Sequence, residues 1–394
     1  MARPKKEETN NGNQTDASKN MLRSMMGGYK EDVYNHIDEK PFRFSTGSLL
    51  LDVILSQNTP ASKNLSGSGP LISGSVLRLS GAFLSGKSSQ AILLAYNYMQ
   101  ECPKSKTIYV KAEGRLSENL IHRTGMKFVY SADEWDYGTV FVLETNKFEP
   151  MADILENLLR AMHQNGEKLF CIIDSLDGLI LTDDAAKNIK ESGVVAGLPK
   201  ITKLFFRRMA LPINKYNSFF VLISGVSSEI KLNPYSKEPP RPVNGSGGAS
   251  AAHAADVILE YNPRYNGDLI LQNPKEKPSI DNKVLGHEVS LKIIKSTNES
   301  DSMVCRIPIK RGRIGTPNSV WVEKEILDYC LAFEILKKKG AWVSFDQSLV
   351  DEAKSVGIEL KEQFQGLESA YSYIEENKPV FDWLYSKFKK ILTQ

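Results

Sequence analysis

The chain has 394 residues, of which 41% are hydrophobic and 25% charged, and its 50 Lys and Arg nearly balance its 47 Asp and Glu. These values are ordinary for a globular protein of two or three domains, and they require any nucleic-acid surface to be local. No apolar run approaches the roughly 18 residues of a membrane span, and the first 20 residues lack the apolar centre of a secretory signal. These features exclude a membrane protein, a disulfide scaffold and a fully disordered chain, so we expect no membrane partner.

The four cysteines form no CxxC pair and are typical of reduced thiols in a cytoplasmic protein. They are Cys102, Cys171, Cys305 and Cys330. We expect Cys171, within the apolar run LFCII, to lie in the core. The five histidines have no spacing typical of zinc ligands, so we expect no structural or catalytic transition metal.

The N-terminal part is predicted to hold two segments before the core begins. Residues 1–20 are polar and poor in aliphatic side chains, which is typical of a flexible tail. Residues 21–44 are mixed and could hold a short helix that ends before Pro41. In STGSLLLDVIL an apolar stripe follows Ser45 or Thr46, and either could be the N-cap of a helix.

Strands and helices then alternate, which predicts an α/β fold with a mostly parallel sheet and helices on both of its faces. The predicted strands are 76–80, 107–112, 139–144, 169–174 and 219–224. The predicted helices are 88–100, 117–124, 151–164 and 199–212. Four further strands should extend the sheet, at 257–262, 268–272, 287–295 and 302–310. The core therefore spans 45–314.

After residue 314 the pattern becomes richer in helix, which predicts a small C-terminal domain over 315–394. We expect a helix over 322–339, a short strand over 341–345, and helices over 349–356 and 363–392. Pro379 should split the last helix, because proline cannot continue the hydrogen-bond ladder of a helix interior.

A phosphate-binding loop is predicted at residues 81–88, where GAFLSGKS fits the pattern G-x-x-x-x-G-K-[ST] between a strand and a helix. Gly81 and Gly86 allow a tight turn whose N–H groups point at phosphate oxygens. Lys87 brings an ammonium to the β- and γ-phosphates, and the Ser88 hydroxyl can bind Mg²⁺. The alternative is a simple Gly/Ser turn. We expect Ser85 and Ser89 to line the same ATP site.

Two carboxylates are expected to complete the ATP site. Asp174 ends an apolar strand, so it should meet the phosphate loop at the carboxyl edge of the sheet and hold Mg²⁺, partly through water. Its alternative role is a helix or turn cap. Glu113 follows the strand after the P-loop helix and could polarise water for attack on the γ-phosphate. Glu144, at the end of 139–144, is a rival that we consider less favoured by topology.

Several segments together resemble the RecA/RadA recombinase family, and most closely bacterial and phage RecA. They are STGSLLLD, SGSVLRLSGAFLSGKSS, YVKAEGRL, FCIIDSLDGL, GSGGASAAHAADVILE, KIIKS and GAWVSF, in that order from about residue 40 to the end. The resemblance implies a RecA-type P-loop ATPase in which Glu113 is catalytic and Asp174 binds the metal. It also implies that Lys295 reaches the ATP of a neighbouring subunit, and that residues 21–44 pack on the next subunit.

The resemblance further implies a helical filament on single-stranded DNA that pairs with homologous duplex DNA. Two DNA-binding loops are expected, at about 183–200 and 227–249. Each is a poor helix or strand by composition, which in a compact core indicates function or disorder. The candidate DNA-binding residues are Lys187, Lys190, Lys200, Arg207, Lys231, Lys237, Arg241, Gly247 and Gly248. For any single loop lysine, a solvated side chain is about as probable as a phosphate contact.

The sequence departs from the family pattern at several positions. The switch between ATP and the second loop falls on Ser224 and Gly225, and glycine has no side chain with which to sense a phosphate. The second trans-acting lysine falls on Thr297, and the position of the adenine-stacking tyrosine on Leu120. The second loop is also longer and richer in proline. These departures indicate a divergent member from a phage or mobile element, which would act in the cytoplasm of a bacterial host.

The function expected from these residues is that of a DNA-dependent ATPase that drives homologous pairing and strand exchange. Single-strand-binding and loader proteins are further candidate partners. One alternative is an accessory protein of recombination that binds ATP and DNA with little turnover, which the substitutions at Gly225, Thr297 and Leu120 favour. Another is a hexameric helicase with a RecA-type core, which the STGS and GAWVSF segments argue against.

Overall fold

The computed structural model describes residues 12–28, 40–56, 65–114, 116–186, 197–228, 242–243, 248–273, 276–297, 300–315 and 318–392. Residues 1–39 form one unit and residues 40–394 another. The first unit contains helix α1 (Gly12–Gly28), on which Met21, Leu22 and Met25 are exposed. This helix begins inside the segment 1–20 that was predicted to be a flexible tail, so that boundary is wrong. The helix ends in Gly27 and Gly28, which explains its C-terminal bound.

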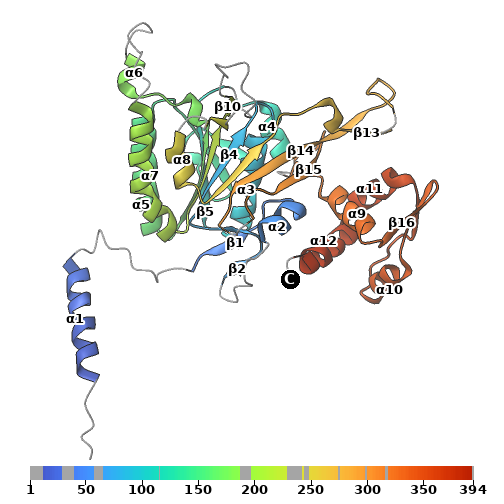
Figure 1. Cartoon of the computed structure of the whole chain (residues 1–394), viewed down its shortest axis with the longest axis horizontal. Coiled ribbons are helices and arrows are strands. Elements are labelled where there is room, and N and C mark those ends of the chain that lie inside the picture. Colours follow the sequence, from blue (N-terminus) through green and yellow to red (C-terminus); the bar gives the residue numbers. More distant parts are fainter. Residues whose placement is uncertain are drawn as a thin grey trace, which may run out of the picture. The chain divides into compact units, whose positions relative to one another are not determined.

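A sheet of ten strands forms the centre of the second unit (Figure 1). Seven strands run parallel in the order β12-β4-β9-β8-β5-β7-β6. Their bounds are β4 (Val76–Gly81), β5 (Ser105–Lys111), β6 (Lys127–Val129), β7 (Thr139–Glu144), β8 (Lys168–Asp174), β9 (Phe219–Ser224) and β12 (Val257–Tyr261). Three antiparallel strands extend the β12 edge, namely β13 (Leu269–Leu271), β14 (Val284–Lys295) and β15 (Val304–Lys310). The mostly parallel α/β fold is confirmed; only the short strand β6 was not predicted.

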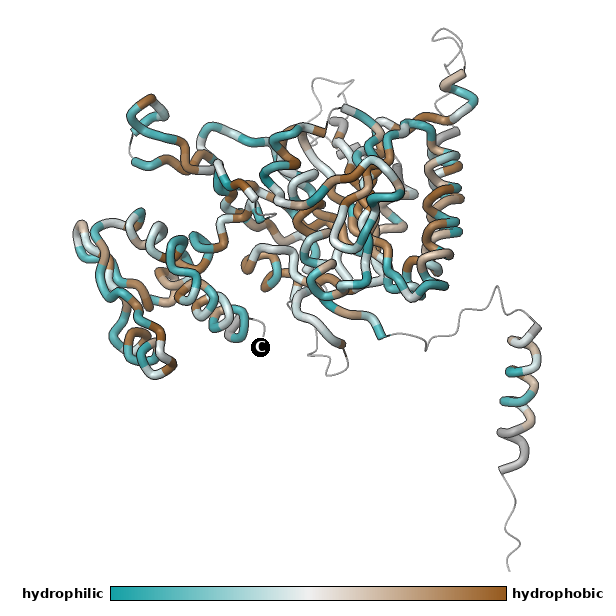
Figure 2. The backbone as a smooth tube through the Cα atoms, turned by 180° about the vertical axis from the view of Figure 1, so that it is seen from behind, coloured by the Kyte–Doolittle hydropathy of each residue, from teal (hydrophilic) through white to brown (hydrophobic). Residues whose placement is uncertain are grey.

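Helices cover both faces of this sheet. One face carries α3 (Lys87–Glu101) and α4 (Glu118–Thr124), and the other carries α5 (Phe148–Gln164), α7 (Gly197–Lys215) and α8 (Gly248–Ala254). Alternate side chains of β8 enter the two cores: Phe170 packs with the α3 core, whereas Cys171, as expected, is buried in the α5 core. Figure 2 shows the resulting hydrophobic interior. Among the described residues, no helix combines the length and apolarity needed to cross a membrane.

A small N-terminal sheet closes one end of the α3 core. It contains β1 (Phe42–Phe44), β2 (Ser66–Gly67) and β3 (Leu71–Ile72). In the sequence, β1 comes before helix α2 (Leu49–Ser56), and β2 and β3 come after it. The rings of Phe42 and Phe44 lie 5.0 and 5.4 Å from that of Tyr98. Residues 40–44 therefore belong to the core unit, and the predicted N-terminal segment ends five residues too late. Aromatic burial against α3 explains the difference.

The N-cap of α2 is also corrected by the structure. The hydroxyl of Ser48 accepts a hydrogen bond from the N–H of Leu51 at 3.1 Å, so Ser48 is the cap. Ser45 and Thr46, the predicted alternatives, instead bond the buried carboxylate of Asp52. The N-cap is therefore Ser48 and not one of the two earlier residues, because their side chains bond Asp52 and are not available to the N–H groups of the first turn.

The C-terminal region is not only helical, since it contains its own three-stranded sheet. After α9 (Val322–Ala332) come β16 (Leu336–Lys339), β17 (Trp342–Phe345) and β18 (Gln363–Gln365). The predicted helix over 322–339 ends early, at the positive φ of 59° at Glu334. The remaining helices are α10 (Gln347–Ser355), α11 (Gly366–Glu376) and α12 (Lys378–Leu392). Pro379 is the second residue of α12, so the predicted split of the last helix is confirmed.

The described ends of both predicted DNA-binding loops have regular structure. Within 183–200 lie most of α6 (Thr182–Ala186) and the start of α7, and Asp183 and Asp184 favour the first turn of α6 through the helix dipole. Within 227–249, β10 (Ser227–Ser228) pairs with β11 (Pro242–Val243), and α8 begins at Gly248. Parts of both predicted loops are therefore regular, and residues 187–196, 229–241 and 244–247 of them lie outside the described residues.

A buried carboxylate joins the C-terminal region to the core. Glu325 on α9 is 4% exposed and accepts hydrogen bonds from the Ser48 hydroxyl at 2.5 Å and the Leu49 N–H at 2.8 Å. Burial raises the pKa of Glu325 to about 8, the two hydrogen bonds oppose this shift, and Asp52 adds to it. Glu325 therefore holds the first turn of α2 onto α9.

We expect the stability of the protein to fall as pH rises from about 5 to about 8, because the folded-state pKa of Glu325 lies above its unfolded value and folding then favours the protonated form. Glu325→Gln should flatten this slope, since an amide can still serve both Ser48 and Leu49. Glu325→Ala should cost about 1–3 kcal/mol for each of the two donors left unpaired. Urea unfolding at pH 5, 6.5 and 8 measures the free energy of unfolding of each protein and so tests both expectations. If this free energy depends on pH equally in wild type and in Glu325→Gln, the raised pKa of Glu325 is contradicted.

Candidate functional site

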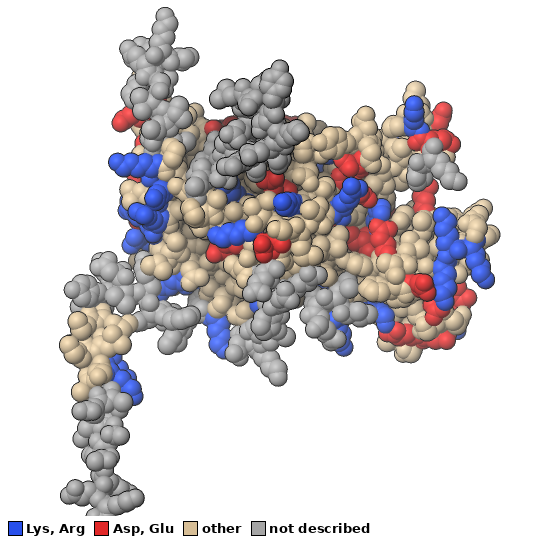
Figure 3. All heavy atoms as spheres, viewed as in Figure 1, with Lys and Arg blue, Asp and Glu red and all other residues tan. Residues whose placement is uncertain are grey.

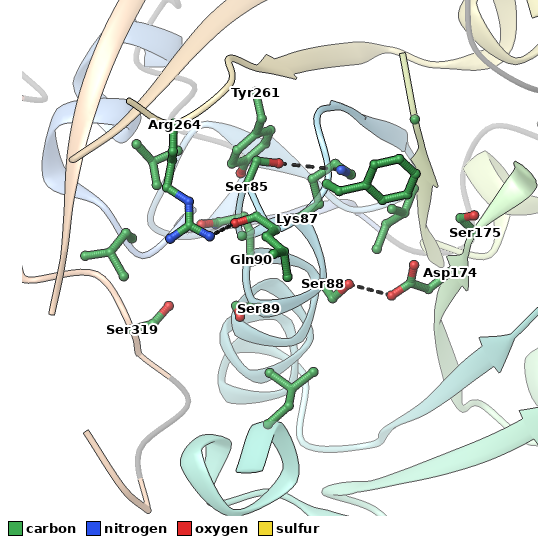
Figure 4. A pocket seen from close by; sticks show the side chains of 18 of the residues that line it. Ser85, Lys87, Ser88, Ser89, Gln90, Asp174, Ser175, Tyr261, Arg264 and Ser319 are labelled. Carbon is green, nitrogen blue, oxygen red and sulfur yellow. Dashed lines mark hydrogen bonds between the residues drawn. The ribbon is translucent and has the colours of Figure 1, made fainter. Parts of the chain in front are cut away.

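A pocket lies at the carboxyl ends of the parallel strands. It has a volume of about 390 Å³, within the range of ligand sites. The P-loop, the start of α3 and the ends of β8, β9 and β12 contribute to its wall, and Figure 4 shows its side chains. Asp174 and Ser175 lie on one side of α3, whereas Arg264 and Ser319 lie on the other. The pocket is therefore where ligands bind in open α/β sheets.

The P-loop has the backbone that its sequence predicts. Gly81 has a φ of +139°, and a Cβ there would lie 2.3 Å from the carbonyl oxygen of Tyr261. Gly86 has a φ of +99° and immediately precedes α3, whose first N–H groups are available to an anion. Only glycine combines this conformation with the close approach of β12 to the loop.

The side chain of Lys87 donates hydrogen bonds to the backbone of the P-loop. Its Nζ donates to the carbonyl oxygens of Gly81 at 2.9 Å and Ala82 at 2.7 Å, and Ser85 Oγ also donates to the Ala82 carbonyl at 2.7 Å. Burial lowers the pKa of Lys87, and the carboxylates of Asp174, Asp177 and Glu113 oppose that shift. A phosphate entering the loop would offer the ammonium stronger, charged acceptors.

Ser88 and Asp174 lie together as predicted. Ser88 Oγ donates to Asp174 Oδ2 at 2.6 Å, and the Tyr109 hydroxyl donates to the same oxygen. Burial raises the pKa of Tyr109 well above its usual value, and Asp174 raises it further, so the phenol keeps the proton that it donates. Hydroxyl and carboxylate oxygens are the ligands that Mg²⁺ prefers, so these residues fit that ion.

The two rival glutamates have different surroundings. Glu113 lines the pocket, and its Oε1 accepts a hydrogen bond from Ser175 Oγ at 2.7 Å. Glu144 is not part of the described pocket wall. Its carboxylate pairs with Lys111 at 2.7 Å, directly across the β5–β7 ladder. The arrangement places Glu113, and not Glu144, beside the P-loop.

Ser224 and Gly225, the predicted switch, line the pocket but are held by other groups. The buried hydroxyl of Ser224 accepts a hydrogen bond from Arg78 Nε at 3.0 Å. The backbone N–H of Gly225 donates to Asp177 Oδ2 at 2.5 Å. Asp177, three residues after Asp174, thus contacts the start of the segment that leads to the second loop.

The other predicted ATP-site residues differ in whether they line the pocket. Ser89 lines the pocket and its Oγ accepts a hydrogen bond from Arg123 at 2.7 Å, and Leu120 also lines it. Lys295 does not belong to the pocket wall of its own chain. Its Nζ donates to the carbonyl oxygens of Ala255 and, at 3.4 Å, His253, at the C-terminal end of α8.

The predicted DNA-binding residues that the structure describes lie on α7 and α8. Lys200 and Arg207 are exposed on α7, together with Lys203 and Arg208, and Gly248 begins α8. Figure 3 shows Lys and Arg side chains along the α7 edge. The other candidates lie outside the described residues: Lys187, Lys190, Lys231, Lys237, Arg241 and Gly247.

Sequence reasoning missed five residues of the pocket region: Tyr109, Arg123, Asp177, Arg264 and His287. Arg264 lines the pocket beyond the end of β12, and its guanidinium donates to the carbonyl oxygen of Leu84 at the tip of the P-loop. A rule that polar residues just after parallel strands gather at one edge would have found Asp177 and Arg264. Tyr109, Arg123 and His287 carried no such signal.

A phosphate loop beside an acidic strand end, on a mostly parallel sheet with helices on both faces, is consistent with the RecA-type α/β fold. No family model matches the chain. It is 23% identical over 355 residues to Protein RecA of Helicobacter hepaticus, which covers 89% of this chain and 85% of the relative. It is also 23% identical to Protein RecA of Wolinella succinogenes (89% and 83% covered) and to Protein RecA of Mycoplasma mycoides (80% and 78%). The chain is a distant relative of the RecA proteins.

Proposed function

We propose that this protein is an ATP-dependent DNA recombinase that assembles on single-stranded DNA and promotes homologous pairing and strand exchange. The observation that carries the proposal is the hydrogen bond between Ser88 and Asp174 beside Lys87, in a chain that resembles RecA over 89% of its length. The phosphate loop supports nucleotide binding, and the likeness to RecA supports its use in recombination. The cytoplasm of a bacterial host is the proposed site of action.

The chemical step we propose is hydrolysis of the terminal phosphate of ATP. Gly81–Ser88 backbone amides and Lys87 bind the phosphates, and Ser85 and Ser89 flank them. Ser88 and Asp174 would hold Mg²⁺, which supplies positive charge at the phosphate oxygens when it is bound. Glu113 orients and deprotonates the attacking water, while Ser175 fixes the direction of its carboxylate.

The second ATP contact we propose comes from a neighbouring subunit. Lys295 lies outside its own pocket wall, which fits a role in the pocket of the next subunit of a filament. There its ammonium would stabilise the negative charge that develops in the transition state of phosphoryl transfer. The exposed Met21, Leu22 and Met25 of α1 support an apolar contact between subunits through the N-terminal segment.

DNA binding is assigned to the segments at 183–200 and 227–249 and to α7. Exposed Lys200 and Arg207 would contact DNA phosphates, and the start of α8 at Gly248 offers backbone N–H groups. In the sequence, the first segment follows the pocket residues Asp174 and Asp177, and the second follows the pocket residue Gly225. ATP in the pocket can therefore influence the DNA-binding segments.

We expect single-stranded DNA to stimulate steady-state ATP hydrolysis, and the stimulation to weaken as salt rises from about 50 to 200 mM, because phosphate contacts release counterions. Strand exchange between homologous DNAs should require ATP under the same conditions. Little hydrolysis with or without DNA would instead identify an accessory protein. Closed rings that unwind forked duplex would identify a helicase, and hydrolysis indifferent to DNA would mean that the segments do not communicate with the pocket.

A further inference from the structure

The pocket has a second half, away from the side on which the phosphates and the metal are expected to bind. Asp174, Ser175 and Glu113 lie on the side of the expected terminal phosphate, so the nucleoside must leave the P-loop toward the opposite side. Figure 4 shows Arg264 and Ser319 on that opposite side of α3. This half of the pocket has aliphatic side chains and a histidine where a base or sugar would lie.

Four of its side chains share one face of the β14–β15 ladder. His287 is directly opposite Ile309, and Val289 is directly opposite Ile307, so all four point the same way. All four line the pocket, as does Leu120 of α4. An aliphatic wall of this kind suits a flat ring, and His287 is its one polar member among these five residues.

Arg264 determines which ring nitrogen of His287 carries the proton. Its Nη1 lies 3.3 Å from His287 Nε2, and an arginine can only donate, so Nε2 must accept. Burial lowers the pKa of His287 to about 4, with Arg264, Arg311 and Arg123 lowering it further and Asp268 raising it. The neutral imidazole therefore carries its proton on Nδ1.

The Nδ1–H group of His287 has no hydrogen-bond partner among the residues that the structure describes. His287 is only 9% exposed, so solvent cannot readily replace a protein partner. A buried donor without an acceptor is unfavourable, and a ligand acceptor in this half of the pocket would remove the penalty.

We propose that Arg264 and His287 form a recognition pair for the nucleoside half of the nucleotide, in which Arg264 positions the imidazole and His287 donates Nδ1–H to a hydrogen-bond acceptor of the base or ribose. The pair rests on the proposed function, because it needs a nucleotide in the P-loop. Arg264 also bonds the Leu84 carbonyl, so it connects this recognition to the tip of the phosphate loop. Both residues come from the same chain as the P-loop.

The test compares two substitutions of nearly equal size. In His287→Asn the amide can replace the Nδ1–H donor, whereas His287→Leu removes it. We expect DNA-free protein to bind ATP about tenfold more weakly after His287→Leu, the effect of one neutral hydrogen bond, and near wild-type strength after His287→Asn. Isothermal titration gives the affinities, and thermal unfolding without nucleotide checks that both variants are folded.

Nucleotide analogues identify the acceptor. The 1-deaza, 3-deaza and 7-deaza forms of ATP each lack one purine nitrogen, and 2′-deoxy-ATP lacks a ribose oxygen. We expect one of these analogues to bind wild type about tenfold more weakly than ATP binds wild type. The same analogue and ATP should bind the His287→Leu variant equally well, because the donor that distinguishes them is absent. If wild type binds ATP but the His287→Leu variant discriminates all four analogues as wild type does, the recognition pair is overturned and the proposed function stands. If wild type binds no nucleotide, both are overturned.

A second measurement isolates Arg264. Proton titration of ¹³C-labelled histidines by NMR should show that Arg264→Gln raises the pKa of His287 from near 4, because a nearby positive charge is removed. The His287→Asn variant identifies the signal among the five histidines. An unchanged pKa after Arg264→Gln would overturn the positioning role of Arg264.

Discussion

We expect Glu113→Gln to lower the maximal rate of ATP hydrolysis by about 10²–10⁴-fold, the usual contribution of a general base, while ATP still binds as tightly as to wild type. The carboxylate lies in the pocket wall beside Ser175 and makes no contact with the P-loop lysine that the structure shows. The amide keeps the shape of the side chain but cannot take a proton from water. Single-turnover hydrolysis with protein in saturating excess over ATP, together with nucleotide titration, separates the chemical step from binding.

The matched control is Glu144→Gln. Glu144 also ends a parallel strand, but its carboxylate is paired with Lys111 outside the described pocket wall, and its side chain is 57% exposed. Its substitution should leave the hydrolysis rate unchanged. A fall in rate with Glu144→Gln and not with Glu113→Gln would reverse the assignment. If wild type is already as slow as the Glu113→Gln variant, the protein is an accessory factor and not an ATPase.

Lys87→Ala should abolish ATP binding and strand exchange together. The ammonium bonds the Gly81 and Ala82 carbonyls inside the P-loop, where the phosphates would bind, and loss of a comparable charge-stabilising donor lowers kcat by about 10²–10³-fold. Wild type should show a rise in melting temperature with ATP and Mg²⁺, because a ligand that binds only the folded state stabilises it. The variant should show no such rise.

Lys111→Ala provides the control for Lys87→Ala. It also removes one lysine near the carboxyl edge of the sheet, but that lysine pairs with Glu144 and does not line the pocket. ATP should still raise its melting temperature. Strand exchange by the Lys87→Ala variant with ATP would reject the proposed dependence on the P-loop.

The core strands and the phosphate side of the pocket could be predicted because their signals are local. Buried parallel strands such as 169–174 are apolar throughout, and the P-loop motif places Lys87 and Ser88 by spacing alone. Asp174 and Glu113 followed from the rule that ends of parallel strands meet at one edge. The structure brings Lys87, Ser88, Asp174 and Glu113 into one pocket.

The nucleoside half could not be predicted because its contacts depend on distant pairing. His287 reaches the pocket only because β14 joins the sheet antiparallel to β12 and pairs with β15 in one register. Nothing near residue 287 in the sequence indicates that register. The missed strand at Leu336–Lys339 has a related cause: its lysines suit a helix equally well, and only pairing with β17 makes it a strand.

The hydrogen bond from the Gly225 backbone to Asp177 means that a side chain at position 225 is not needed to connect the pocket with the segment beyond β9. A backbone donor cannot be removed by substitution, except by proline, so this link would tolerate sequence drift at 225. Thermodynamic reciprocity then applies to the proposed function: whatever factor ATP adds to the affinity for DNA, DNA adds to the affinity for ATP. We expect the hydrogen bond between Gly225 and Asp177, on the pocket side of this segment, to contribute to that shared factor.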